Sequence, residues 1–179
     1  CGHHLAGPED VRRLADAGAS ALTHLGNGMP NQVHRHNNPL LAGLAEERLK
    51  VLFIPDGHHL PDHVLNVFAR AAGADRLIAT TDAASAAGLP PGTYNVLGNR
   101  AVLEPDGRLH NPEKQCLVGS SATLLACMNV LHALGFFPLD ALLRIGFYNP
   151  LKLIRIEPAD IPSCKHGVIF APDTGFALH

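Results

Sequence analysis

The 179-residue chain has no run of basic side chains, no long apolar segment and no closely paired cysteines. Its 14 Lys and Arg residues are scattered among 16 Asp and Glu residues, and the formal net charge of −2 argues against a nucleic-acid-binding surface. No stretch approaches the roughly 18 uncharged residues that cross a bilayer, and the start does not resemble a signal peptide. We therefore expect a soluble, cytoplasmic protein that binds neither a membrane nor a nucleic acid.

The cysteines are too far apart to form a paired metal-binding motif. They are Cys1, Cys116, Cys127 and Cys164. We interpret them as reduced and mostly buried thiols without a functional role.

Histidine is the residue type that is abundant, with 12 in the chain. It is the commonest metal ligand and the usual proton carrier near neutral pH, but it also occurs on surfaces and in hydrogen-bonded cores. Seven histidines lie in polar or helical contexts and are interpreted as structural: His34, His36, His63, His110, His132, His166 and His179.

Strand and helix signals alternate along the first 82 residues. Short apolar runs predict strands at 21–23, 51–54 and 77–81. Apolar residues at helical spacing predict helices at 8–18, 40–47 and 61–73. Strands that alternate with helices of about ten residues indicate an α/β fold, in which helices pack outside a parallel sheet.

The pattern changes after residue 82. A hairpin is predicted from strands at 93–96 and 100–103, with a turn at Asp106-Gly107. Helices are predicted at 121–134 and 139–154, the second broken near Pro150, and a last strand at 167–171.

Polar side chains follow the predicted strands. His24 follows the first strand and Asp82 the third, and His3 lies one helix and one strand before His24. The C-terminal ends of parallel strands meet at one edge of a sheet, so His3 and His24 are expected to share one cation at roughly 2.0–2.1 Å from each nitrogen. Two histidines without a common role would give the same pattern, and Asp82 alone would suit a helix cap or a turn.

Five segments together carry a more specific signal. They are His3, residues 23–30 (Thr-His-Leu-Gly-Asn-Gly-Met-Pro), residues 56–59 (Asp-Gly-His-His), residues 81–83 (Thr-Asp-Ala) and residues 119–121 (Gly-Ser-Ser). In this order they resemble the successive motifs of N-acetylglucosamine-6-phosphate deacetylases, in the amidohydrolase superfamily.

The resemblance implies a (β/α)₈ TIM-type barrel with a small β-domain. Residues 1–158 would be the C-terminal half of the barrel, with a β-hairpin insertion at about 92–110, and residues 159–179 a strand segment of the small domain. It implies a divalent metal, zinc or else iron, and a homodimer. The implied reaction is hydrolysis of the N-acetyl amide of an amino-sugar phosphate by metal-bound water, giving acetate and an amine.

Roles follow from the resemblance residue by residue. His3 and His24 resemble the metal-binding histidines, and Asp82 resembles the catalytic aspartate that acts as general base and acid. The family's metal-binding glutamate would precede His3, so a third ligand is not found in this chain.

The remaining site residues are implied contacts with substrate. Asn27, with the backbone at Gly28, resembles the phosphate contact, and His59 resembles a residue that hydrogen-bonds the substrate. Arg35 falls where the family carries a phosphate-binding arginine donated across the dimer. Around it the family usually reads Gly-Arg-Glu-Pro-Gly, whereas this chain has His-Arg-His-Asn-Asn-Pro, and Gly26 replaces a usual aromatic residue.

Two other interpretations stay open. The chain could belong to an amidohydrolase that acts on a different amide or a cyclic amide, or it could be a non-catalytic half-barrel that binds a partner or itself. Four barrel strands without the other four would leave open strand edges, so we expect the isolated chain to self-associate and to show no useful deacetylase activity.

Overall fold

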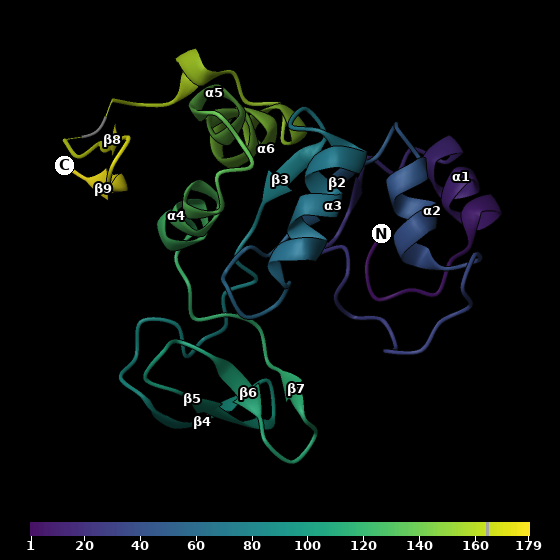
Figure 1. Ribbon diagram of the computed structural model, residues 1–179, viewed down its shortest axis with the longest axis horizontal. Helices are drawn as coiled ribbons and strands as arrows, with labels where there is room; N and C mark the ends of the chain where they lie inside the picture. Colours follow the sequence, from purple (N-terminus) through teal and green to yellow (C-terminus); the bar gives the residue numbers. More distant parts are fainter. Residues whose placement is uncertain (164) are drawn as a thin grey trace.

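The computed structural model describes residues 1–163 and 165–179 and shows an α/β fold (Figure 1). Cys164, one of the predicted buried thiols, lies outside the described residues. No helix of the described residues is long and apolar enough to cross a membrane.

The first part of the chain forms a parallel sheet with helices between its strands. The strands are β1 (Ala21–Leu22), β2 (Lys50–Phe53) and β3 (Leu77–Ala79), in the order β1-β2-β3. The helices are α1 (Pro8–Asp16), α2 (Pro39–Ala45) and α3 (Asp62–Ala72). The predicted alternation is therefore confirmed, with each boundary shifted by a few residues at most.

Local sequence explains where α2 and α3 begin and end. The Asn38 side chain accepts a hydrogen bond of 2.9 Å from the backbone N–H of Leu41, which caps α2, and Pro39 occupies the first turn. Gly73 ends α3 with a φ of 67° and a ψ of 164°, a combination that glycine adopts readily because it has no Cβ.

The chain start extends the parallel sheet beyond β1. The Cys1 amino group donates to the Ala21 carbonyl at 2.9 Å, and the Thr23 N–H donates to the Cys1 carbonyl at 2.7 Å. This is the hydrogen-bond pattern of a parallel neighbour. His3 consequently leaves the sheet at the same edge as His24.

Apolar side chains of this sheet and its helices form the main core. Phe53 of β2 and Phe68 of α3 are buried and meet edge to face, with ring centroids 6.4 Å apart. The Arg76 guanidinium joins the end of α2 to the start of β3 by donating to the carbonyls of Gly43, Leu44, Glu46 and Leu49.

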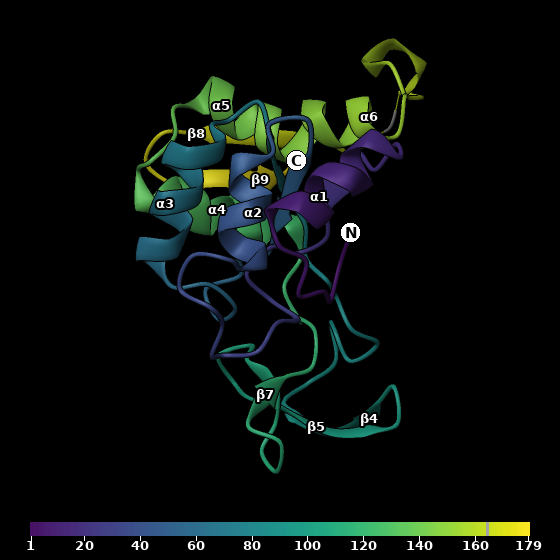
Figure 2. The ribbon, with the colours of Figure 1, turned by 90° about the vertical axis from the view of Figure 1, so that its right-hand side faces the viewer.

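A second, antiparallel sheet follows β3. Its strands are β4 (Gly92–Val96), β5 (Asn99–Leu103), β6 (Leu109–Asn111) and β7 (Cys116–Leu117), in that order across the sheet. It has a small core of its own, which includes Val96, Ala101 and Leu109. Figures 1 and 2 both show it lying apart from the helices. The predicted hairpin is confirmed as β4 and β5, whereas β6 and β7 were not predicted.

The last part of the chain is helical and ends in a hairpin. Its elements are α4 (Leu124–Leu134), α5 (Leu139–Leu143), the π-helical η1 (Arg144–Tyr148), α6 (Asn149–Leu153), the 3₁₀ turn η2 (Pro158–Asp160), β8 (Val168–Ala171) and β9 (Gly175–Leu178). The predicted break near Pro150 is confirmed: the π-helical η1 interrupts the α-helix, and α6 begins with Pro150 in its first turn.

Two asparagine side chains attach this last part of the chain: Asn149 holds α6 against the parallel sheet, and Asn129 holds the C-terminal hairpin against α4. The Asn149 amide donates to the carbonyls of Ala74 and Leu77 at 2.7 and 2.8 Å, which holds α6 against β3. Asn129 of α4 exchanges two hydrogen bonds, of 2.7 and 2.9 Å, with the backbone of Phe176 in β9, a strand that was not predicted. Membership of this hairpin in a small β-domain remains a prediction.

Candidate metal and acid–base site at the strand ends

Left-handed backbone marks the ends of the parallel strands. His3, His24 and Asp82 have φ angles of 50°, 32° and 51°, and Gly57, after β2, has 83°. Among the described residues six non-glycine residues have positive φ, so these three are half of the set. Such a conformation costs a non-glycine residue of the order of 1–3 kcal/mol and tends to occur at functional sites. The residues that the sequence assigned to the chemistry thus share this conformation, and the other three residues that have it are Leu97, Gln115 and Arg155.

The imidazoles of His3 and His24 meet at this edge. Their Nε2 atoms are 3.0 Å apart and the ring planes are inclined by 72°, so the predicted convergence is confirmed. This separation is short enough for both nitrogens to bind one cation at the usual distance of about 2.0–2.1 Å. One N–H···N hydrogen bond between the rings would also suit the distance.

Two imidazole nitrogens are ligands that suit a divalent transition metal, but they do not make a complete site. His24 is buried, and its Nδ1 has no hydrogen-bond partner within the described residues. A ligating histidine ordinarily donates that second N–H to a carbonyl or carboxylate. Within residues 1–163 and 165–179 no three His, Cys, Asp or Glu side chains are grouped closely enough to hold a metal.

The segment 27–28 lies against the histidine pair. The Asn27 backbone N–H donates to the His24 carbonyl at 3.0 Å, and a Cβ built on Gly28 would lie 2.8 Å from the His3 ring. A small cavity of about 20 Å³ is lined by His3, Asn27 and Met29, among other residues. Position 28 therefore favours glycine for two reasons, the φ angle of 66° and the close approach of the His3 ring.

A buried carboxylate organises the end of β2. Asp56 accepts hydrogen bonds of 2.9 Å from the backbone N–H groups of His58 and His59, 2.8 Å from His59 Nδ1 and 2.7 Å from Ser120 Oγ. Burial alone would raise the pKa of Asp56, but these hydrogen bonds hold it well below its usual range. The side chain of His59 is only 6% exposed, so its orientation is fixed by this contact.

The loop at 119–121 connects this carboxylate to the end of β3. The Ser120 N–H donates to the Asp82 carbonyl, and the Ala84 N–H donates to the Ser120 carbonyl, each at 2.9 Å. Ala83 and Ser120 form an isolated parallel bridge. Asp82 itself is exposed, which suits a group that exchanges protons with a substrate.

Known proteins resemble this chain over most of its length. It is 32% identical over 87% of its residues to the N-acetylglucosamine-6-phosphate deacetylase of Vibrio furnissii, and 28% identical over 97% to the N-acetylgalactosamine-6-phosphate deacetylase of Escherichia coli O157:H7. Its homologues are amino-sugar-phosphate deacetylases. The chain covers 38% and 46% of these two relatives, and it matches no protein-family model.

Solved deacetylase structures share the fold. The N-acetylglucosamine-6-phosphate deacetylase of Mycobacterium smegmatis superposes with a TM-score of 0.84 at 26% identity, over 98% of this chain and 48% of its own. The Pasteurella multocida enzyme gives 0.81 at 26% identity, over 98% and 46%. An aspartate-to-alanine variant of the M. smegmatis enzyme, solved with N-acetyl-D-glucosamine-6-phosphate, gives 0.78 at 26% identity, over 87% and 42%. The chain thus has the fold of about half a deacetylase.

The predicted site residues fall into two groups on this deacetylase-like fold. One contains His3, His24, Asn27 and Gly28. The other contains His59 and Asp82, which are linked through Asp56 and the backbone of Ser120. Arg35 belongs to neither group, because it is exposed on the loop between β1 and α2.

Sequence reasoning did not assign a role to Asp56 or to the Ser120 hydroxyl. The available signal was local: an aspartate directly after a buried strand can accept from the N–H groups two and three residues later, as an Asx turn. Nothing local indicated its contact with Ser120, 64 residues away.

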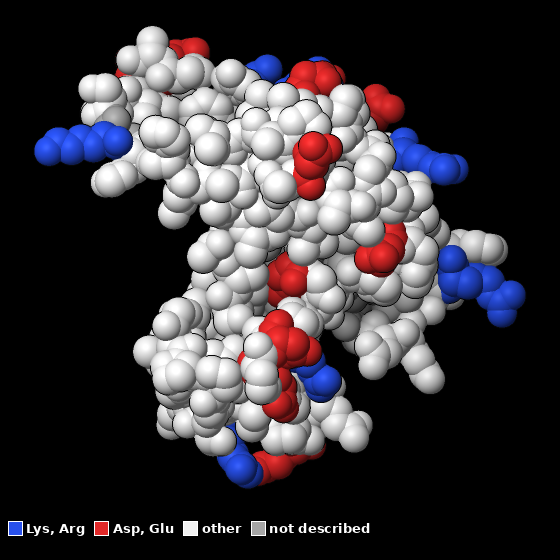
Figure 3. Space-filling model, turned by 60° about the vertical axis from the view of Figure 1, so that its left-hand side comes forward, with Lys and Arg blue, Asp and Glu red and all other residues white. Residues whose placement is uncertain are grey.

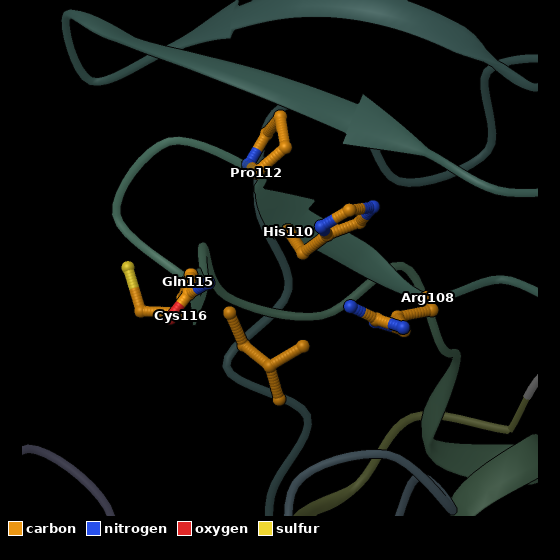
Figure 4. A pocket seen from close by; sticks show the side chains of 6 residues that line it. Arg108, His110, Pro112, Gln115 and Cys116 are labelled. Carbon is orange, nitrogen blue, oxygen red and sulfur yellow. The ribbon is translucent and has the colours of Figure 1, made fainter.

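Two larger cavities lie away from the strand ends. One, of about 440 Å³, is lined by residues of the antiparallel sheet that include Arg108, His110 and Gln115 (Figure 4). The other, also about 440 Å³, lies beside α3 and α5. His110 Nε2 contacts Glu104 at 2.8 Å, so one of its two ring nitrogens is already paired within the sheet. We place the site at the strand ends because the His3 and His24 rings meet there and Asp82 stands at the end of another strand of the same sheet.

The thiols and the surface charges add no second site. Burial raises the pKa of Cys127 to about 12, which makes that thiol inert, and Cys1 is partly buried. Cys116 is exposed, so the expectation of burial is wrong for it.

On the face that Figure 3 presents, basic side chains lie singly and make no continuous area.

Replacing Gly28 by alanine is expected to weaken zinc binding at the histidine pair, because the added methyl group would displace the His3 ring. Gly135→Ala, at the end of α4, is the matched control: its φ is 68° against 66°, but nothing lies within 4 Å of its Cβ. Both variants should lose about 1–2 kcal/mol of stability from the left-handed backbone. Calorimetric zinc titration separates them, and equal zinc affinities would contradict the assignment of His3 as a zinc ligand.

Proposed function

We propose that this chain supplies the second half of a (β/α)₈ barrel in a metal-dependent deacetylase that acts on an N-acetyl amino-sugar phosphate. The observation that carries the proposal is the 3.0 Å approach of His3 and His24 at the strand ends of a chain whose homologues bear that name. N-acetylglucosamine 6-phosphate is the proposed substrate, and glucosamine 6-phosphate and acetate are the products.

His3 and His24 would hold the divalent cation, zinc or iron, because imidazole nitrogens suit both metals. Such a cation supplies Lewis acidity, which acidifies water and polarises the amide carbonyl. Asp82 takes the proton of the attacking water and delivers it to the leaving nitrogen. The exposed position of its carboxylate at the end of β3 supports this role.

Recognition of the substrate is assigned to the neighbouring segments. We assign Asn27 and the backbone at Gly28 to the phosphate, and His59 to a hydrogen bond with the substrate. Arg35 is exposed on its loop, which supports the proposal that its guanidinium binds the substrate phosphate in the site of the other subunit of a homodimer. We place the protein in the cytoplasm, where sugar phosphates are metabolised.

A different amide substrate is the second candidate. It is favoured by the residues around Arg35, where the usual Gly-Arg-Glu-Pro-Gly is absent. The same metal ligands and Asp82 would serve either substrate.

The test is acetate release by the whole protein, loaded with zinc, from N-acetylglucosamine 6-phosphate, N-acetylgalactosamine 6-phosphate and unphosphorylated N-acetylglucosamine. We expect release from a phosphorylated substrate and a much higher KM without the phosphate. Release from none of the three, with zinc bound, would contradict the proposal and direct attention to cyclic amides.

The metal assignment predicts a difference in zinc content. In the whole protein, His24→Ala removes one of the proposed zinc ligands, so bound zinc should fall well below the wild-type content. His63→Ala, on the exposed start of α3, is the matched control. Equal zinc content in wild type and His24→Ala, measured by mass spectrometry after dialysis, would remove His24 from the site.

The 179-residue chain by itself is expected to lack useful deacetylase activity. A catalytic zinc normally has three protein ligands, and the described residues bring only two histidines together. The open edges of its sheets should make it self-associate. Acetate release with added zinc and molar mass by light scattering test both expectations, and an active monomer would contradict them.

A further inference from the structure

The Asp56 carboxylate uses both of its oxygens inside the protein. Oδ1 accepts from the two backbone N–H groups that follow it, and Oδ2 accepts from His59 Nδ1 and Ser120 Oγ, all within 2.7–2.9 Å. The side chain is only 1% exposed, so water does not compete for these bonds. An ionised carboxylate can accept all four, since it has about four lone-pair positions and no proton.

This arrangement determines which nitrogen of His59 carries the proton. A carboxylate can only accept, so the 2.8 Å contact requires a hydrogen on His59 Nδ1. In the neutral imidazole the lone pair is then on Nε2. His59 therefore offers a hydrogen-bond acceptor at Nε2, and a substrate N–H or O–H group would be its complement.

The same carboxylate fixes the loop beside Asp82. The Ser120 hydroxyl gives its hydrogen to Asp56 and accepts from the Ala122 N–H at 3.1 Å. With its side chain held on both sides, the Ser120 backbone binds the Asp82 carbonyl and the Ala84 N–H. These bonds brace Asp82 in its left-handed conformation.

We infer that Asp56 is a positioning residue that sets the tautomer of His59 and, through Ser120, the backbone conformation of Asp82. Its bearing on catalysis rests on the proposed function, but the two structural effects do not. Asp56 touches neither substrate nor metal in this scheme and acts through its partners.

Asparagine at this position cannot replace the carboxylate. An amide has one acceptor oxygen, and its NH₂ group would face at least one pair of donors that Asp56 now satisfies. In Asp56→Asn the proton of His59 is therefore no longer confined to Nδ1, and the Ser120 hydroxyl loses its acceptor or competes for the remaining one.

The experiment is nitrogen NMR of the histidine rings, together with amide hydrogen exchange, on the whole chain. In the wild type, at a pH where the nitrogen shifts show the ring to be neutral, His59 is expected to carry its hydrogen on Nδ1 and to leave Nε2 unprotonated. In Asp56→Asn this preference should be lost. Wild-type His59 with the proton on Nε2, or an unchanged tautomer in a folded Asp56→Asn, would overturn the inference.

Ser120→Ala separates the two effects. It should leave the His59 tautomer unchanged while the Ser120-to-Asp82 and Ala84-to-Ser120 amides exchange about tenfold faster or more, as the loss of a hydrogen bond to a charged group allows. Unchanged exchange would overturn the link to Asp82. If Asp56→Asn does not fold, the His59 tautomer in the wild type still tests the first effect, and amide exchange in Ser120→Ala still tests the second.

Neither readout needs a substrate or a metal. A protein that releases no acetate but shows both NMR effects would contradict the proposed function and leave this inference standing. An active deacetylase in which Asp56→Asn keeps the His59 tautomer would support the proposed function and contradict this inference.

Discussion

Asp82→Asn is expected to lower the kcat of the whole, zinc-loaded protein by roughly 10²–10⁴-fold, the effect of losing a general base. Asparagine keeps the shape of the side chain, and the Asp82 carbonyl still accepts from the Ser120 N–H, so the fold and the metal content should be retained. Because the amide cannot take a proton from water, only the chemical step is affected. Steady-state acetate release, with zinc content measured on the same sample, tests this.

Asp62→Asn is the matched control, since Asp62 is also exposed but lies in the first turn of α3. It removes the same charge from the same part of the chain and should leave kcat within about a factor of two of the wild type. Near-normal turnover in Asp82→Asn, or an equal loss in both variants, would show that another group carries the proton.

Phe68→Ala is expected to destabilise the chain by about 3–5 kcal/mol, a large share of the stability of an ordinary domain. Phe68 is fully buried and packs its ring against Phe53, so its loss leaves a cavity between α3 and β2. Because β2 leads directly to Asp56, the same change should loosen the site. Urea unfolding followed by circular dichroism measures the loss.

Val67→Ala provides the comparison within the same helix, since Val67 is 52% exposed. It should cost no more than about 1 kcal/mol, because a surface substitution leaves no cavity. Similar midpoints for the two variants would mean that the interface between α3 and β2 contributes little to stability.

The parallel part of the fold could be predicted because its signals are local. Apolar runs of three to five residues and helical apolar spacing are visible within one element, so β1, β2, β3 and the three helices between and before them were found. The strands β6, β7 and β9 were missed. Two of them have three residues or fewer, too short for an alternating pattern, and β9 is held by Asn129 of a distant helix.

The site divides in the same way. The sequence by itself determined that His3, His24 and Asp82 stand at strand ends, because the order of strands and helices fixes which residues leave a parallel sheet at one edge. Only the tertiary structure decided that the two Nε2 atoms face each other at 3.0 Å, and that Asp56 accepts from Ser120. The first contact spans 21 positions of the sequence and the second spans 64. Such contacts depend on side-chain direction and burial, which no short stretch of sequence encodes.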